Sequence, residues 1–383
     1  MRFIYCLFLT LFGLSQTALS QDEKEVERFN VLEDDFWVTS QANALGGATS
    51  TNGQFMDAAY YNPAGLAGYS LTQKAGTVKM VNFPYVGFSA GENSANLSPN
   101  FDNVEEEGNP ILSTALHEAT TGKQQYTRYS IVPSFNIGSF VATYTADTQL
   151  FVSPTGTENV YTTHFRSKSG PGIGWSSHDN QNRLYLGVFA AKLDYTTISE
   201  DHTFTDIEDP VERKDFFTGT TKYQATHINV GATWIIPSKK APSTIALVFR
   251  NAGGTKLKAA DSDVEDITIK EDATLGYQIA PHLGHYGHMA FMLDFERLGQ
   301  YDITFTKKIK TGLEFGFGRT NENRPIFAIR TGYNYSGLSY GAGFNLGILG
   351  IDYAAYKVDE RVGNIIDDKG RSSAVVTIDV GRL

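Results

Sequence analysis

Three histidines spaced three residues apart have the clearest potential for metal chemistry in this sequence. His282, His285 and His288 could bind zinc through imidazole nitrogens if their side chains converged. On a β-strand, however, a spacing of three places successive side chains on opposite faces of the sheet. A turn followed by a strand at a membrane interface explains the run better, and we predict no metal site.

An acidic run offers a second candidate for cation binding. Asp261-Ser262-Asp263, followed by Glu265 and Asp266, supplies oxygen atoms of the kind found in calcium loops. It lacks the glycine at the turn and the bidentate glutamate at the required distance. We expect a solvated surface loop at the level of the lipopolysaccharide. None of these residues predicts an enzyme or a cofactor.

The N-terminus has the pattern of an export signal. Arg2 precedes an apolar run over 3–14, and Ala18-Leu19-Ser20 forms a small-residue cleavage site before Gln21. No later segment approaches the roughly 20 apolar residues that a membrane-spanning helix needs. The single cysteine, Cys6, would leave with the signal, which excludes disulfides, thiol catalysis and thiolate metal sites.

Composition narrows the class of protein. Without residues 1–20 the basic side chains fall from 32 to 31, because Arg2 is lost, against 42 acidic ones, so the net charge is near −11. This balance argues against nucleic acid as a partner. With 37 Gly, 20 Tyr, 25 Phe and a mean hydropathy of −0.25, the chain is too polar for a helical membrane protein and too aromatic for a disordered one. A transmembrane barrel reconciles these facts.

Strict alternation between residues 309 and 356 predicts the strands of such a barrel. In 309–317 one parity reads Ile-Thr-Leu-Phe-Phe, while lysine, glycine and glutamate fill the other. Sixteen candidate segments between residues 73 and 380 correspond to about fourteen strands. We expect long polar connections at 91–126, 196–221 and 253–266 to be extracellular, and tight ones such as Ser336-Gly337 to be periplasmic turns.

Residues 40–68 precede the strands and differ from them in composition. The segment is rich in small residues, and Asn62 followed by Pro63 is a typical helix start, because asparagine caps free backbone N–H groups and proline has none. A helix start and small residues have no place on a lipid-facing wall. We therefore expect this segment inside the barrel.

Two runs in this region resemble a known family. Residues 44–48, Ala-Leu-Gly-Gly-Ala, and 57–66, Asp-Ala-Ala-Tyr-Tyr-Asn-Pro-Ala-Gly-Leu, are similar to the N-terminal hatch of the FadL-type (TodX) outer-membrane transport proteins. Residues 132–135, 310–315, 330–334 and 351–354 resemble later strands of the family, and the last three are shared with PorV-like barrels of the type IX secretion system. The resemblance covers both ends of the chain and leaves a divergent middle. The chain departs from such barrels by ending in Leu383 rather than an aromatic residue.

The resemblance implies an all-β architecture in three parts. Residues 1–20 are expected to be a signal peptide, 21–70 an N-terminal segment with the hatch, and 71–383 a transmembrane antiparallel β-barrel of about fourteen strands. The hatch motif comprises Asp57, Asn62, Pro63, Ala64 and Gly65. The expected location is the bacterial outer membrane, with the lipid bilayer, lipopolysaccharide and the barrel assembly machinery as partners.

The resemblance also implies passive uptake of hydrophobic small molecules such as long-chain fatty acids, which leave sideways through the wall. Pro133 cannot donate a ladder hydrogen bond, so a proline in a strand sits at an edge, a bulge or a gap, and we predict it as the lateral opening. The alternatives are a strand start or a rim position. A PorV-like barrel that docks secreted proteins is the alternative function. The inward-facing parity carries Glu314, Arg330, Asn334 and Asn345, which favours a hydrated lumen and weighs against uptake.

Overall fold

The computed structural model describes most of the strands and part of the N-terminal region. The described residues are 39–51, 58–67, 81–91, 125–154, 160–203, 220–281, 283, 287–300, 305–318, 325–346, 349–357, 360–362, 365–367 and 370–380. The predicted signal peptide, Asp57, His282 and His285 lie outside these residues, as does most of the connection 91–126. No helix within the described ranges is long and apolar enough to cross a membrane.

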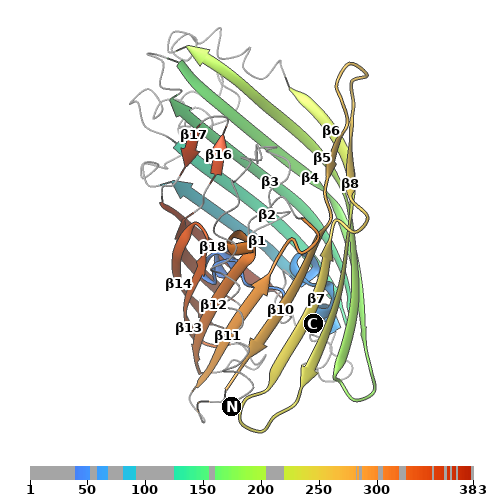
Figure 1. Cartoon of the computed structure of the whole chain (residues 1–383), viewed down its shortest axis with the longest axis vertical. Helices are drawn as coiled ribbons and strands as arrows, with labels where there is room; N and C mark the ends of the chain where they lie inside the picture. Colours follow the sequence, from blue (N-terminus) through green and yellow to red (C-terminus); the bar gives the residue numbers. More distant parts are fainter. Residues whose placement is uncertain are drawn as a thin grey trace.

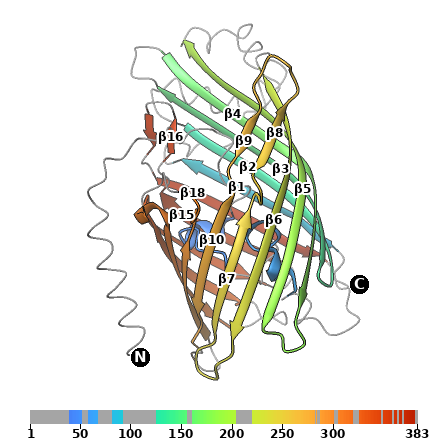
Figure 2. The same cartoon turned by 45° about the vertical axis from the view of Figure 1, so that its right-hand side comes forward.

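The described strands form a large antiparallel sheet, as predicted, and the order of neighbours returns to its start. β1 pairs with β2 on one side and with β18 on the other. The pairings continue from β1 through β2, β3 and β4 to β5, and from β18 down the other side to β7 and β6. Because β5 also pairs with β6, fourteen of the described strands follow one another in a ring (Figures 1 and 2). They are β1 (Val81–Gly91), β2 (Gln125–Ile137), β3 (Phe140–Pro154), β4 (Val160–His178), β5 (Leu184–Thr203), β6 (Thr221–Ile236), β7 (Ser243–Arg250), β10 (Asp272–Ile279), β11 (Gly287–Phe295), β12 (Ile309–Phe317), β13 (Phe327–Asn334), β14 (Gly337–Asn345), β15 (Leu349–Lys357) and β18 (Gly370–Val380).

Shorter elements lie at one end of this ring, which we call the loop end. A hairpin of β8 (Thr255–Ala259) and β9 (Ile267–Ile269) extends β7 and β10 there. β16 (Glu360–Val362) pairs with β17 (Ile365–Asp367), and a 3₁₀ turn, η2 (Phe305–Lys308), precedes β12. The opposite end carries the Gly138-Ser139 turn between β2 and β3, and we call it the turn end.

The polarity of the two faces of the ring is the reverse of that in a soluble protein, with polar residues inside and apolar residues outside, as β6 illustrates. His227 and Asn229 are buried on the inner face, whereas Ile228, Val230 and Trp234 are 41%, 40% and 54% exposed on the outer face. Alternation with period two separates these residues. A continuous apolar outer face needs a non-aqueous surrounding, which is the pattern of a membrane barrel.

The wall is taller along β3 to β6 than elsewhere. These strands have 15 to 20 residues, against 8 or 9 in β12 to β15, and about 9–11 tilted residues cross a bilayer. On β5 the outward apolar positions end at Ala190, and exposed Lys192 and Asp194 follow toward the loop end. The tall strands therefore extend beyond the apolar belt at the loop end.

The N-terminal helices lie within the ring (blue in Figures 1 and 2). They are α2 (Ser40–Ala44), α3 (Ala58–Tyr61) and η1 (Pro63–Gly65). We call residues 39–51 and 58–67 the inner segment. All but two of its side chains are buried, although the segment is polar in part, because the wall encloses it.

Two of the sequence predictions about connections are wrong. Residues 253–266 are not a plain loop, because most of them build β8 and its turn toward β9. The sequence predicts the tight turn Ser336-Gly337 at the end opposite the long connections, but it lies at the loop end together with residues 253–266. Two of the sixteen candidate segments, 158–168 and 170–177, merge into one strand, β4, because Gly170 and Pro171 still pair with β3.

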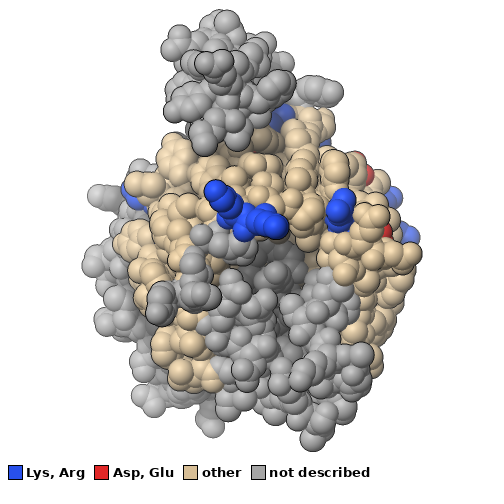
Figure 3. All heavy atoms as spheres, turned by 90° about the horizontal axis from the view of Figure 1, so that it is seen from below, with Lys and Arg blue, Asp and Glu red and all other residues tan. Residues whose placement is uncertain are grey.

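The turn end is basic where it is described (Figure 3, seen from this end). The turn before β5 contributes Arg183, and the turn between β6 and β7 contributes Lys239 and Lys240, all exposed. Asp179 accepts hydrogen bonds from the N–H groups of Arg183 and Leu184. These bonds, first that of Leu184, hold the pKa of Asp179 below its usual value and fix the turn.

Candidate functional site

The inner segment fits against the wall where the wall has glycine. A Cβ on Gly332 of β13 would meet the backbone of Leu45 and Gly46, and one on Gly187 of β5 would meet the backbone of Pro63. A Cβ on Gly231 of β6 would collide with the side chain of Asn62. Any larger side chain at these positions would displace the segment. The inward-facing glycines thus form its seat.

Asn62 joins the two halves of the inner segment to the wall. Its Oδ1 accepts from the N–H of Ala64, which makes it the N-cap of η1. Its Nδ2 donates to the carbonyl oxygen of Ser50 at 2.6 Å and to Oγ1 of Thr233 on β6 at 2.8 Å. Asn62 is 1% exposed, so the loss of these bonds would leave buried polar groups unpaired.

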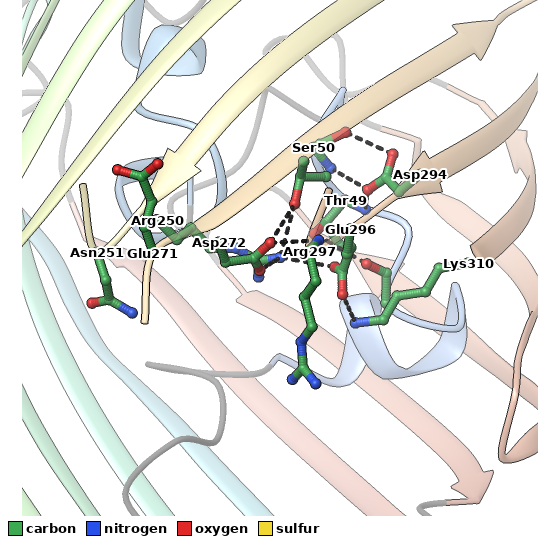
Figure 4. A network of polar contacts seen from close by, with 12 residues as sticks. Thr49, Ser50, Arg250, Asn251, Glu271, Asp272, Asp294, Glu296, Arg297 and Lys310 are labelled. Carbon is green, nitrogen blue, oxygen red and sulfur yellow. Dashed lines mark hydrogen bonds and ion pairs between the residues drawn. The ribbon is translucent and has the colours of Figure 1, made fainter. Parts of the chain in front are cut away.

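Asp294 of β11 holds the other half of the segment (Figure 4). Its Oδ2 accepts from the N–H groups of Thr49 and Ser50, both at 2.8 Å, and its Oδ1 accepts from Oγ of Ser50 at 2.6 Å. A carboxylate that receives three hydrogen bonds at 1% exposure is a strong anchor. Asp294 is a site residue that the strand pattern alone did not single out.

A network of ion pairs flanks Asp294 on the loop-end side (Figure 4). Nη2 of Arg250 lies 2.9 Å from Oδ2 of Asp272 and 2.8 Å from Oε1 of Glu296. Nζ of Lys310 lies 2.7 Å from Oε2 of Glu296. These residues come from β7, β10, β12 and the end of β11, so the network ties neighbouring strands together.

A second network lies on the turn-end side of the inner segment. Nε of Arg330 lies 2.6 Å from Oε2 of Glu314, and its Nη1 lies 2.5 Å from Oδ1 of Asp352. His288 Nε2 lies 3.1 Å from the other oxygen of Glu314. Glu314 and Arg330 therefore face the interior, as the sequence predicted, and they engage each other. Asn334 donates to the carbonyl oxygen of Gly46, and Asn345 to that of Pro325.

The opposite side of the interior, along β2 to β6, carries a third ion network beside a large apolar cluster. In this network Nε of Arg128 lies 2.7 Å from Oδ1 of Asp147, and Nζ of Lys168 lies 3.5 Å from its Oδ2. One buried cluster joins α3 to the wall and reaches the β8–β9 hairpin: Ala58, Ala59, Tyr60, Leu66, Val132, Val141, Phe189, Ala191, Leu193, Tyr195, Tyr223, Ala225, Leu257 and Ile269. We call it the apolar band. It connects the loop end with Val132 on β2.

Tyr60 occupies the middle of this band. Its ring packs against Phe189 with a centroid distance of 4.9 Å, and its hydroxyl group lies 3.0 and 2.9 Å from Oγ1 of Thr143 and Thr145 on β3. Burial raises the pKa of Tyr60 to about 12, so the phenol stays neutral. The aromatic ring completes the apolar surface while the hydroxyl group is hydrogen-bonded.

Pro133 lies where the ladder between β1 and β2 is irregular. Asn82 is opposite Ser134 and Tyr85 is opposite Val132, so the register shifts between them. The ladder of β1 with β18 shifts at the same level, between Phe83 and Val86. Pro133 sits inside β2, on the outward parity beside the exposed Ile131, and is not a strand start or a rim residue.

A second proline, which the sequence argument overlooked, stands on the neighbouring strand. Pro84 lies in β1 between the two residues that bracket the shift. Each proline removes one ladder donor. The ladder between β1 and β2 therefore loses backbone donors at this irregularity, beside Val132 of the apolar band.

Other chemical motifs in the described residues have structural explanations. The pattern Gly-x-Ser-x-Gly occurs at 87–91 and 337–341, but both copies lie within strands, and Ser339 donates to the carbonyl oxygen of Ala44. Among the residues that the structure describes, no group of three His, Cys, Asp or Glu side chains could hold a metal ion. Asp261 accepts from the N–H of Asp263 at the hairpin turn.

No protein-family model and no curated protein matches this sequence. Among solved structures, the toluene transporter TodX from Pseudomonas putida is 10% identical, with a TM-score of 0.43 over 91% of this chain and 98% of that one. CdiB from Acinetobacter baumannii is 9% identical, with a TM-score of 0.36 over 78% of this chain and 60% of that one. The translocator domain of the autotransporter NalP from Neisseria meningitidis is 10% identical, with a TM-score of 0.34 over 78% and 88%. Similarity at this level assigns neither a family nor a ligand to the chain.

Proposed function

We propose that this protein is an outer-membrane β-barrel that takes up hydrophobic small molecules passively, with the inner segment as its hatch. The outward apolar face supports the membrane location, and the interior arrangement supports the transport. In this proposal the loop end faces the exterior and the turn end faces the periplasm. The protein is a channel and not an enzyme.

The apolar band carries the proposal. Leu257 and Ile269 lie at its loop end, Tyr60 and Phe189 in the middle, and Val132 beside the irregular ladder. Contact with such a surface lowers the free energy of a hydrophobic solute, because each methylene group that leaves water contributes about 0.8 kcal/mol. The band therefore offers a route from the exterior to the wall at Pro133 rather than straight through the barrel.

The remaining side of the interior is closed by polar contacts. The two ion networks flank the inner segment on β7 to β15, and each joins several strands. An apolar solute cannot replace the hydrogen bonds of these buried charges. Glu314 and Arg330, which weighed against uptake, lie on this side, whereas the buried ion pairs of Asp147 with Arg128 and Lys168 lie beside the band.

Replacing Pro133 with Val tests the lateral exit. Valine restores the ladder donor and keeps an apolar side chain on the lipid-facing parity, so the barrel should still assemble. Uptake of a labelled alkane, aromatic compound or long-chain fatty acid by cells should fall toward the level of an empty vector. Surface expression, measured by heat-modifiable migration in detergent gels, should stay constant.

Pro171→Val is the matched control for this experiment. Pro171 also lies within a strand, on the exposed face of β4, but its neighbours keep their register on both sides. Uptake should be unchanged in this variant. Equal uptake by Pro133→Val and wild type would show that the solute does not leave at Pro133. A wild-type chain that confers no uptake at all would instead favour the PorV-like docking of secreted proteins, tested by pull-downs.

A further inference from the structure

The β8–β9 hairpin is set apart from the rest of the wall by its connections. Asn251 with φ 51° and Gly253 and Gly254 with φ 80° interrupt the strand between β7 and β8. Left-handed backbone at three of four consecutive residues ends the ladder of β7 and redirects the chain. Residues 251–254 therefore separate the hairpin from β7, and we call them the joint.

Few backbone pairings hold the hairpin to its neighbours. On β6, Tyr223 is opposite Ala259 and Gln224 is opposite Lys258, and the register differs from that of β6 with β7. Among the described strands β9 pairs with β8 alone. Elements with few ladder bonds open locally at a lower free energy than the ring does.

The two faces of the hairpin differ sharply. Leu257 is 0% and Ile269 is 6% exposed, and both belong to the apolar band. Lys256 and Lys258 point outward, and Lys256 pairs with Asp266 across the hairpin. The hairpin thus covers the loop end of the band with an apolar surface and presents charge to the outside.

Hydrogen bonds connect the joint with the inner segment. Oδ1 of Asn251 lies 2.7 Å from Nδ1 of His227, and the N–H of Asn251 donates to Oδ1 of Asn229. Nδ2 of Asn229 donates to the carbonyl oxygen of Tyr60 at 3.2 Å. Two hydrogen bonds therefore link Asn251, through Asn229, to Tyr60 in the middle of the band.

We propose that the β8–β9 hairpin is a hinged outer gate, which swings about residues 251–254 and 270–271 to uncover the apolar band. This inference rests on the proposed function, because the gate admits the hydrophobic solute of that proposal. Opening exposes Leu193 and Tyr223, which belong to the same buried cluster as Leu257, and it weakens the hydrogen bonds that lead from Asn251 to Tyr60. Closing restores the buried cluster.

A reversible crosslink tests the gate. Gln224→Cys with Lys258→Cys places two thiols on paired, exposed positions of β6 and β8, so oxidation locks the hairpin to the wall. Lys192→Cys with Thr226→Cys is the matched control, because it joins two paired, exposed positions of β5 and β6 within the ring. Cys6 is the only native cysteine and lies in the predicted signal peptide, which should leave no competing thiol.

The first measurement does not depend on transport. Leu193→Cys, added to each pair, places a thiol on the buried face of β5, where it cannot reach the outward cysteines. Its labelling by a membrane-impermeant maleimide added outside should slow on the order of tenfold when the hairpin is locked, and recover on reduction. Equal labelling in the locked hairpin and the locked control would overturn the gate.

The second measurement is uptake of the labelled hydrophobic compound. It should fall when the hairpin is locked, recover on reduction, and stay constant in the control pair. If labelling responds to the lock while wild type takes up nothing, the gate stands and the proposed function fails. If uptake occurs and ignores the lock, the solute enters elsewhere and the gate is refuted.

Discussion

Asp294 is the best place to test how the inner segment is held. In Asp294→Ala the N–H groups of Thr49 and Ser50 lose their acceptor, and Oγ of Ser50 loses its partner. A buried donor left unsatisfied costs about 1–3 kcal/mol, so the two N–H groups together cost about 2–6 kcal/mol. The ring itself keeps all its ladder bonds, so this cost falls on the inner segment.

Hydrogen exchange of the amides of residues 49 and 50 measures the effect directly. A loss of about 3 kcal/mol in local stability raises the exchange rate roughly a hundredfold, because 1.4 kcal/mol corresponds to a factor of ten. Conductance in planar bilayers should rise in the same variant if the segment plugs the lumen. The heat-modifiable migration of the barrel should remain.

Asp272→Asn is the matched control for Asp294→Asn. Asp272 also faces the interior and binds Arg250, but it makes no hydrogen bond to the inner segment. The control should leave exchange at 49 and 50 unchanged, while Asp294→Asn should raise it less than alanine does, because the amide keeps one acceptor. Equal exchange in Asp294→Ala and wild type would refute the anchoring role.

Two further substitutions test the seat and the outer face. Gly231→Ala should destabilise the barrel by about 1–3 kcal/mol, because the new methyl group collides with Asn62, whereas Gly299→Ala meets no atom within 4 Å and should be neutral; urea midpoints in detergent compare them. Val230→Arg should cost about 2–4 kcal/mol in lipid vesicles, because Val230 lies in the apolar belt, whereas Thr226→Arg on the same face of β6 lies beyond the belt and should cost less. Equal unfolding of either pair would contradict the assignment it tests.

The strands could be predicted from the sequence because their evidence is local. Period two between 309 and 356 identifies β12, β13, β14 and β15 to within a few residues, and the same alternation places Glu314 and Arg330 on the inner face. Asn62 with Pro63 could be read as a cap for the same reason, since the bond from Ala64 spans two residues.

The contacts of the inner segment could not be predicted, because they join residues far apart in the chain. Nothing near Asp294 indicates that it binds Thr49 and Ser50, and the glycines on the inner parity give no sign of which segment fills their space. β8 was missed because β-strand alternation there covers only Thr255–Ala259, between polar residues. Pro84 was overlooked because only the pairing of β1 with β2 places it at the same irregularity as Pro133.

In the proposed function, the solute passes along the apolar band rather than along the ion networks of β7 to β15, and the contacts on the two sides explain this choice. Opening the side along β7 to β15 would separate Arg330 from Glu314 and Asp352, and breaking a buried ion pair costs about 3–5 kcal/mol. A hydrophobic solute that displaces Tyr60 and Phe189 replaces the apolar contacts that they give up. The same side also holds the buried ion pairs of Asp147 with Arg128 and Lys168, which passage along the band has to leave intact. The inner segment is anchored on the polar side by Asp294 and contacts the apolar side through α3. In the proposed function, movement at α3 admits a solute while Asp294 keeps residues 49 and 50 in place.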